Sequence, residues 1–153
     1  MNRIFYAMAA SIALVATVAA QAADSGPTGL WLDESGRGGI DIQPCGDKLC
    51  GTLTWLKVPL NAQGKPKTDI HNPDAALQSR PLCGVQVLSG FVPDGPDAWT
   101  GGSIYDAASG KTYKSNMALQ PDGTLHVRGY IGFSFIGRTE TWTRPATRLE
   151  HCT

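Results

Sequence analysis

The chain has 153 residues, with 13 basic and 13 acidic side chains and a formal net charge of zero. Nucleic-acid binding relies on an excess of Lys and Arg that neutralises phosphates, so this balance argues against a nucleic-acid-binding protein. A single domain of ordinary size accounts for the length.

The N-terminal residues have the pattern of a secretory signal peptide. Arg3 supplies a small positive region, residues 4–20 carry no charge, and Ala20-Gln21-Ala22 is a small-x-small cleavage site. The alternative is a membrane anchor, because the apolar stretch approaches the length of a span. Its alanine-rich composition and the lack of a basic cluster behind it favour the signal peptide. We therefore expect cleavage near Ala22, no transmembrane span after cleavage, and a periplasmic or secreted protein.

Turn signals recur about every ten residues through the rest of the chain, a spacing typical of short strands joined in a meander. The expected strands are residues 28–33, 39–44, 49–56, 82–92, 98–105, 111–119, 124–130 and 135–143. Strands joined by short turns pair antiparallel, and eight of them can close into an up-and-down barrel without exposed edges. The prediction is an all-β fold with a single barrel domain over residues 23–145, after a signal peptide over 1–22 and before a C-terminal tail over 146–153.

One long connection interrupts the meander between residues 57 and 81. It carries Asn72-Pro73-Asp74, and residues 73–79 could form one short helix with Asn72 as its cap and Pro73 at its first position. Long connections are often functional, so this segment is a candidate recognition surface.

Four cysteines remain after the expected cleavage, and an even number in an exported chain favours disulfides. Cys45 and Cys50 flank a turn that would bring them face to face, so this pair is the first choice among the three possible pairings. Cys83 and Cys152 are then paired by elimination. A metal site is the weaker interpretation, because no Cys-x-x-Cys pair occurs and the three histidines are scattered. We expect neither a metal nor a cofactor.

Alternation along the expected strands indicates which side chains share a face. In the last strand a ladder of threonines at 139, 141 and 143 suits a solvated outer face, which places the intervening charged and aromatic residues inside. An interior that mixes aromatic and basic side chains suits a binding cavity. Arg128 would hold a carboxylate or phosphate group of the ligand. The residues expected to line the cavity are Trp99, Tyr105, Tyr113, Arg128 and Trp142.

The alternative is a filled barrel, in which the aromatic residues are ordinary core and an inward Arg138 pairs with Glu140. Catalytic motifs such as a Gly-x-Ser-x-Gly elbow or His-Glu-x-x-His do not occur. His126, Tyr105 and Arg128 form the best hydrolytic candidate, but no nucleophile is evident beside them. We therefore expect a protein that is not an enzyme.

A set of motifs in order resembles the exported bacterial family known as domain of unknown function 2147. The resemblance covers residues 26–145. Its motifs are Gly29-Leu30-Trp31, Cys45-Gly46-Asp47-Lys48-Leu49-Cys50-Gly51, Asn72-Pro73, Arg80-Pro81-Leu82-Cys83-Gly84, Trp99-x-Gly101-Gly102-x-Ile104-Tyr105-Asp106, Ser109-Gly110-Lys111-x-Tyr113-Lys114, Arg128-Gly129-Tyr130 and Gly137-Arg138-Thr139-Glu140-Thr141-Trp142-Thr143-Arg144. The tail with Cys152 lies outside the resemblance, and a bridge between Cys83 and Cys152 is not part of the family pattern.

The resemblance implies a lipocalin-like barrel. It also implies a structural contact in which Trp31 closes the barrel base and either Arg138 or Arg144 packs across its ring as a cation–π pair. Two functions follow as hypotheses. The first is a periplasmic or secreted protein that binds a small apolar or anionic molecule. The alternative is a filled barrel in the cell envelope that binds a protein partner through residues 57–81.

Overall fold

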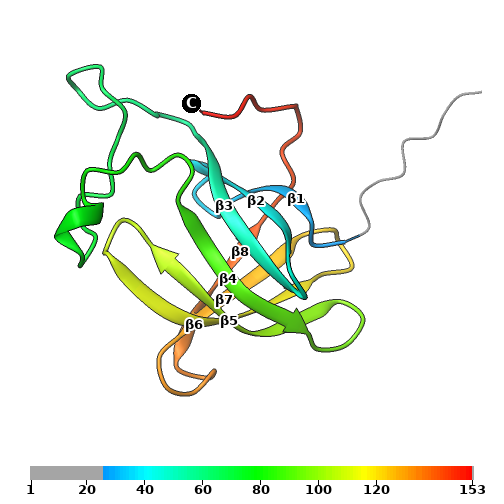
Figure 1. The fold of residues 1–153 in the computed structure, drawn as a ribbon. Helices are drawn as coiled ribbons and strands as arrows, with labels where there is room; N and C mark the ends of the chain where they lie inside the picture. Colours follow the sequence, from blue (N-terminus) through cyan, green and yellow to red (C-terminus); the bar gives the residue numbers. More distant parts are fainter. Residues whose placement is uncertain (1–25, 153) are drawn as a thin grey trace, which may run out of the picture.

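The computed structural model describes residues 26–152, and its regular secondary structure is almost entirely β (Figure 1). The eight strands are β1 (Gly29–Leu32), β2 (Gly38–Cys45), β3 (Lys48–Leu56), β4 (Gln86–Pro93), β5 (Ala98–Asp106), β6 (Lys111–Leu119), β7 (Leu125–Tyr130) and β8 (Gly137–Trp142). The expected signal peptide and its cleavage site lie outside the described residues.

Each strand pairs antiparallel with the next one along the chain, giving one sheet in the order β1 to β8. The sheet curls round until its first and last strands meet. There Leu32 and Thr143 form an antiparallel bridge. The distance from the Leu32 nitrogen to the Thr143 oxygen is 2.8 Å, and the reciprocal distance is 3.0 Å. The predicted all-β, antiparallel up-and-down fold is confirmed.

The two ends of the barrel differ because alternate turns gather at opposite ends. One end carries the turns β1–β2, β5–β6 and β7–β8 and the long β3–β4 connection (residues 57–85), and we call it the mouth. The other end carries the remaining turns and the segment after β8, and we call it the base.

The base half of the barrel is filled by large apolar side chains. Its fully buried members include Trp31, Ile42, Leu88, Phe91 and Leu125. Gly102 on β5 provides the space for Phe91, because a Cβ at this position would lie 2.5 Å from the phenyl ring. This half matches the filled-barrel hypothesis.

Of the two arginines suggested for Trp31, the structure selects Arg144. Its guanidinium carbon lies 3.8 Å from the centroid of the Trp31 ring. Arg138 is instead exposed at the mouth, where it forms an ion pair with Glu34. Since Trp31 is fully buried, the stacked pair seals the base.

Both expected disulfides are present. Cys45 and Cys50 bridge the β2–β3 hairpin with a Cα–Cα distance of 5.8 Å. Cys83 and Cys152 are joined at 6.0 Å, and the Cys152 amide also donates to the carbonyl of Thr54 at 2.8 Å. The C-terminal tail is therefore fastened to the outside of the barrel.

The β3–β4 connection differs from its prediction. Its helix is one 3-10 turn, Ala75–Leu77, and the cap is Asp74, whose carboxylate accepts from the Ala76 amide. The prediction of Asn72 as cap was wrong, because this side chain is buried in a polar cluster described below. β4 begins only at Gln86, since the chain is still turning at Gly84 with a positive φ of 89°.

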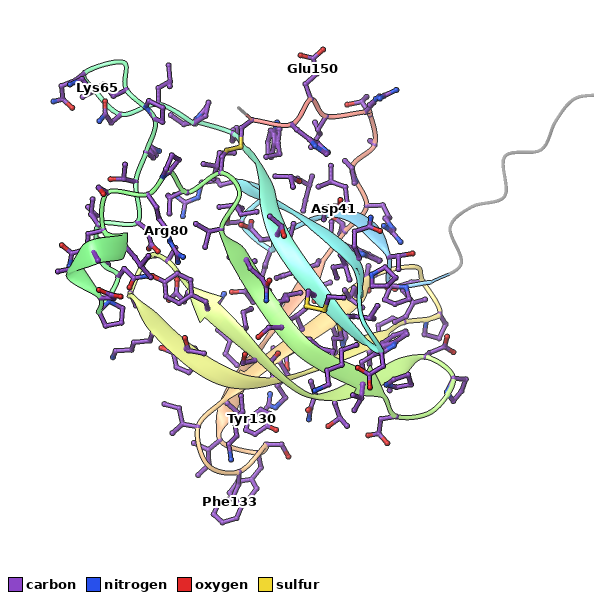
Figure 2. The ribbon with its side chains drawn as sticks, viewed as in Figure 1. Asp41, Lys65, Arg80, Tyr130, Phe133 and Glu150 are labelled. Carbon is purple, nitrogen blue, oxygen red and sulfur yellow. A yellow bond between two sulfur atoms is a disulfide. The ribbon has the colours of Figure 1, made fainter. Side chains whose placement is uncertain are left out.

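The β7–β8 loop (residues 131–136) is longer than predicted. β8 starts at Gly137, so Phe135 and Ile136 belong to the loop and not to the strand. Figure 2 shows Phe133 at the tip of this loop, projecting away from the barrel. No helix in residues 26–152 combines the length and apolar character needed to cross a membrane.

Candidate functional site

The mouth half of the barrel is hollow. A first cavity of about 460 Å³ opens among β5, β6, β7 and β8. Its apolar walls include Ile104, Tyr113, Val127, Ile131 and Ile136, and its polar lining includes Asp106, Arg138 and Glu140. This volume lies within the range of roughly 300–1,000 Å³ typical of small-molecule sites.

A second cavity of about 290 Å³ adjoins the first. Ile104, Asp106 and Glu140 line both, so the two form one hollow divided by these side chains. The second cavity is walled by apolar residues of β2, β3, β4 and β8, among them Ile40, Leu53, Leu56, Val87 and Trp142. The floor is therefore apolar, and carboxylates stand where the two cavities join.

Glu140 is held in place at this junction. Its Oε2 accepts a hydrogen bond from the Trp142 indole nitrogen at 3.0 Å, and its Oε1 lies 4.0 Å from the Arg138 guanidinium. Arg138 also bonds Glu34. That hydrogen bond is the main reason why the pKa of Glu34 is lowered and the pKa of Arg138 is raised. The chain Glu34–Arg138–Glu140–Trp142 thus links the rim to the floor.

Asp106 presents a second carboxylate to both cavities. Its oxygens accept from the Ala108 amide at 2.9 Å and the Ser109 hydroxyl at 2.6 Å, so it also shapes the β5–β6 turn. Ionised carboxylates only accept hydrogen bonds. The carboxylates where the two cavities join are therefore suited to hydroxyl or amine groups of a ligand.

A buried polar cluster fixes the β3–β4 connection beside the mouth. Asp69 is fully buried. Its Oδ1 accepts from the Tyr105 hydroxyl at 2.6 Å, and its Oδ2 accepts from Asn72 Nδ2 at 2.8 Å and from Arg80 Nε and Nη2 at 3.0 and 2.8 Å. The charge of Asp69 is thus matched by Arg80 and every oxygen is occupied, the condition under which a buried ion is tolerated.

The cluster shifts two pKa values in opposite directions. Burial alone raises the pKa of Asp69, but hydrogen bonds from Tyr105, Asn72 and Arg80 outweigh it and leave this pKa lowered. The pKa of Tyr105 is raised by burial and by its bond to the Asp69 carboxylate. Both groups therefore keep their neutral-pH ionisation states, which suits a structural clamp.

Comparison with known proteins places the chain in a family. The sequence profile described as "Uncharacterized protein conserved in bacteria (DUF2147)" matches residues 29–144. The chain belongs to this family. A search of curated proteins finds no match for this DUF2147 protein.

One solved structure shares the fold. It is described as "Protein HP1028 from the human pathogen Helicobacter pylori belongs to the lipocalin family". The TM-score is 0.66 at 23% sequence identity, over 78% of this chain and 82% of the other. At this identity the likeness concerns the fold alone, which is lipocalin-like.

Three of the five predicted cavity residues of this DUF2147 protein do line the hollow. Tyr113 lies in the first cavity, and Tyr105 and Trp142 lie in the second. Trp99 contacts neither, because it is buried in the core.

The expected position of Arg128 was wrong. Leu125 and Val127 take the inner face of β7, so the alternating Arg128 points outward. There its Nη1 donates to Thr139 Oγ1 at 2.9 Å and its Nε donates to the Ser134 carbonyl. The anion anchor expected from the sequence is therefore not in the cavity.

Strict alternation from Trp99 would place Tyr105 on the inner face of β5 and Ile104 on the outer face, and this expectation is wrong beyond the first residues of the strand. Gly101 has a positive φ of 71°, and the register with β6 shifts between Trp99 and Gly102. The shift turns Ile104 into the hollow, while the Ser103 hydroxyl pairs with that of Ser89 at 2.8 Å. Two neighbouring glycines at 101 and 102 were the available signal for this bulge.

Within residues 26–152, no three side chains of His, Cys, Asp and Glu are grouped closely enough to hold a metal ion. His126 and Arg128 are on the outer face of β7, whereas Tyr105 is clamped to Asp69. The hydrolytic trio considered from the sequence is not assembled around the hollow.

Proposed function

We propose that this protein binds a small molecule in the hollow at its mouth and does not catalyse a reaction on it. The observation that carries the proposal is the joined pair of cavities, which end on apolar residues and carry Asp106 and Glu140 where they meet. An eight-stranded barrel is wide enough for one small ligand, and only its base half is packed here.

The ligand we propose has an apolar body and at least one hydrogen-bond donor. The apolar part would lie against Ile104, Val127 and Trp142, and the donor would face Glu140 or Asp106. An anion is a poorer candidate, since Arg128 is outside the hollow and Arg138 is already engaged by Glu34. The remaining arginine of the lining, Arg37, shares the rim of the second cavity with the carboxylate of Asp33.

We further propose that the protein works in the periplasm or outside the cell. The signal-peptide pattern, with its small-x-small site at Ala20-Gln21-Ala22, supports this location. The two disulfides support it as well, because such bridges persist mainly in oxidising compartments.

The test is native mass spectrometry of the protein recovered from the periplasm of its own host, followed by denaturing extraction. Ile104→Trp is the blocking variant, because Ile104 lines both cavities. His126→Gln is the matched control on the outer face of β7. We expect a reproducible bound mass in the wild type and in the control, and none in Ile104→Trp.

A bound mass that persists in Ile104→Trp would place the ligand elsewhere and contradict the proposal. A clean apo mass, together with no thermal shift from a panel of lipids and metabolites, would favour the alternative of a partner protein. That alternative has one observation of its own: Val58, Leu60 and Ile70 are exposed on the β3–β4 connection, at 57, 47 and 62%.

A further inference from the structure

The β7–β8 loop exposes the largest apolar side chains of the described molecule. Ile131, Phe133, Phe135 and Ile136 are 68, 68, 76 and 56% exposed. The sequence Ile-Gly-Phe-Ser-Phe-Ile contains no charge over residues 131–136. Four neighbouring exposed apolar residues differ from the single ones that ordinary surfaces carry, and such patches mark interaction sites.

The loop holds these side chains outward in a defined arrangement. The Ile136 amide donates to the Phe133 carbonyl at 2.9 Å, and the Ile131 amide donates to the Ile136 carbonyl at 3.2 Å. Arg128 donates to the Ser134 carbonyl from the side. The rings of Phe133 and Phe135 stack, with centroids 5.5 Å apart and planes 8° from parallel.

Basic side chains lie at the foot of this loop. Lys114 on β6 is exposed and pairs in register with Tyr130, the last residue of β7. Arg128 contacts the loop itself. The acidic groups nearby are already engaged, since Glu34 bonds Arg138 and Asp106 bonds its own turn.

We propose that the β7–β8 loop inserts into the surface of a lipid bilayer that contains anionic lipids. An uncharged apolar tip with Lys114 and Arg128 at its foot matches such a surface. Apolar side chains reach the acyl boundary there, and Lys and Arg meet the headgroups. The tip is a narrow convex projection (Figure 2). A protein interface usually needs about 800 Å² on each partner, more than a six-residue projection offers.

Docking in this way would bring the first cavity to the membrane. Tyr130, Ile131 and Ile136 form one of its walls, so the loop that inserts also borders the opening. This orientation would favour a lipid-derived ligand. The docking itself goes beyond the proposed function and does not depend on whether the hollow is occupied.

The test is co-sedimentation of the mature protein, its N-terminus verified by mass spectrometry, with two kinds of vesicle. One is phosphatidylcholine alone and the other is phosphatidylcholine mixed with phosphatidylglycerol. The variant is Phe133→Ser/Phe135→Ser, and the matched control is Val58→Ser/Ile70→Ser, which removes comparable exposed apolar groups elsewhere. Removal of both rings should weaken binding to the mixed vesicles by about tenfold or more, and the control should bind like the wild type.

Two further measurements separate the parts of the proposal. Lys114→Gln should lower the preference for phosphatidylglycerol, and added salt should lower the same preference in the wild type. Brominated lipids should quench the tryptophan fluorescence of Phe135→Trp more than that of the wild type. The native tryptophans 31, 55, 99 and 142 are all in strands, whereas the new one would be in the inserting loop.

Failure of the wild type to bind the mixed vesicles would overturn the proposal, as would equal binding by the double phenylalanine variant. If that variant instead abolished self-association seen by light scattering while vesicles stayed unbound, the loop would be a protein interface and membrane docking would be wrong.

Discussion

Arg144 and Trp31 close the base of the barrel by joining the two ends of the sheet. The Arg144 guanidinium stacks 3.8 Å from the Trp31 ring centroid and donates to the carbonyls of Gly26, Thr28 and Leu30 at 2.8, 2.7 and 3.3 Å. Arg144, two residues after the end of β8, thus holds the strand β1 in place beside the Leu32–Thr143 bridge.

Loss of this closure should destabilise the fold. A hydrogen bond from a charged group contributes roughly 1.5–3 kcal/mol, so we expect Arg144→Met to lower the free energy of unfolding by about 3 kcal/mol. Trp31→Ala should cost about 3–5 kcal/mol, as for other buried aromatic residues. Arg148→Met, exposed in the tail, is the control. Urea denaturation measures all three, and an unchanged midpoint for Arg144→Met would mean that the stacking is incidental.

The strands and turns could be predicted from the sequence because their signals are local. Glycine-containing turns and β-rich segments set most strand limits to within a residue or two, and β6 was predicted at 111–119 as observed. The hairpin of Cys45 and Cys50 followed from the same local pattern. These features depend on residues adjacent in the chain or facing each other across one turn.

The candidate site depends on features with no local signal. A bulge at Gly101 reverses the faces of β5, so alternation alone misplaces Ile104. Asp69 bonds Arg80 and Tyr105, which are 11 and 36 residues away, and no periodicity in the β3–β4 connection predicts these contacts. The sequence therefore indicated a barrel with aromatic residues inside, but not which half is hollow.

Gly110 should be essential for seating the β3–β4 connection on the barrel. It has a φ of +70°, and a Cβ there would lie 1.8 Å from the carbonyl oxygen of His71. Gly123 is the matched control, since its φ of +83° is similar but nothing lies within 4 Å of its Cβ. Gly123→Ala should cost only the backbone strain of about 1–2 kcal/mol, and Gly110→Ala distinctly more. Hydrogen exchange should show lost protection around residues 67–82 in Gly110→Ala alone; equal effects in both variants would contradict this seating role.

The two disulfides should differ in their contribution to stability. Cys45 and Cys50 are 5 residues apart and Cys83 and Cys152 are 69 apart. Loop-closure entropy then gives about 2 kcal/mol for the first bridge and about 4 kcal/mol for the second. We expect Cys83→Ser/Cys152→Ser to lower the melting temperature more than Cys45→Ser/Cys50→Ser. The reverse order would indicate that the hairpin bridge stabilises the fold by more than restraint of the unfolded chain.

Protonation of Asp69 should lower the free energy of unfolding in acid. Its pKa in the folded protein is below the ordinary value of 3.8, because the hydrogen bonds from Tyr105, Asn72 and Arg80 outweigh burial. A carboxyl group with a lowered folded pKa stabilises the fold above its unfolded pKa, and this contribution is lost as the pH falls through the folded value. We therefore expect the free energy of unfolding to decline as the pH drops below 3.8, and Asp69→Asn to flatten that decline.

The same substitution has a second expected effect at neutral pH, and a control separates the two. Removing one partner of a buried ion pair costs about 3–5 kcal/mol, and we expect the lower end because the Arg80 side chain is 35% exposed. Asp122→Asn is the control, since the pKa of Asp122 is also lowered, by hydrogen bonds from Thr124, yet its carboxyl is in an exposed turn. Asp122→Asn should change little in either the free energy of unfolding at neutral pH or its decline in acid. An acid profile identical in Asp69→Asn and the wild type would mean that other carboxylates cause the acid sensitivity and that the cluster fixes the connection without its charge.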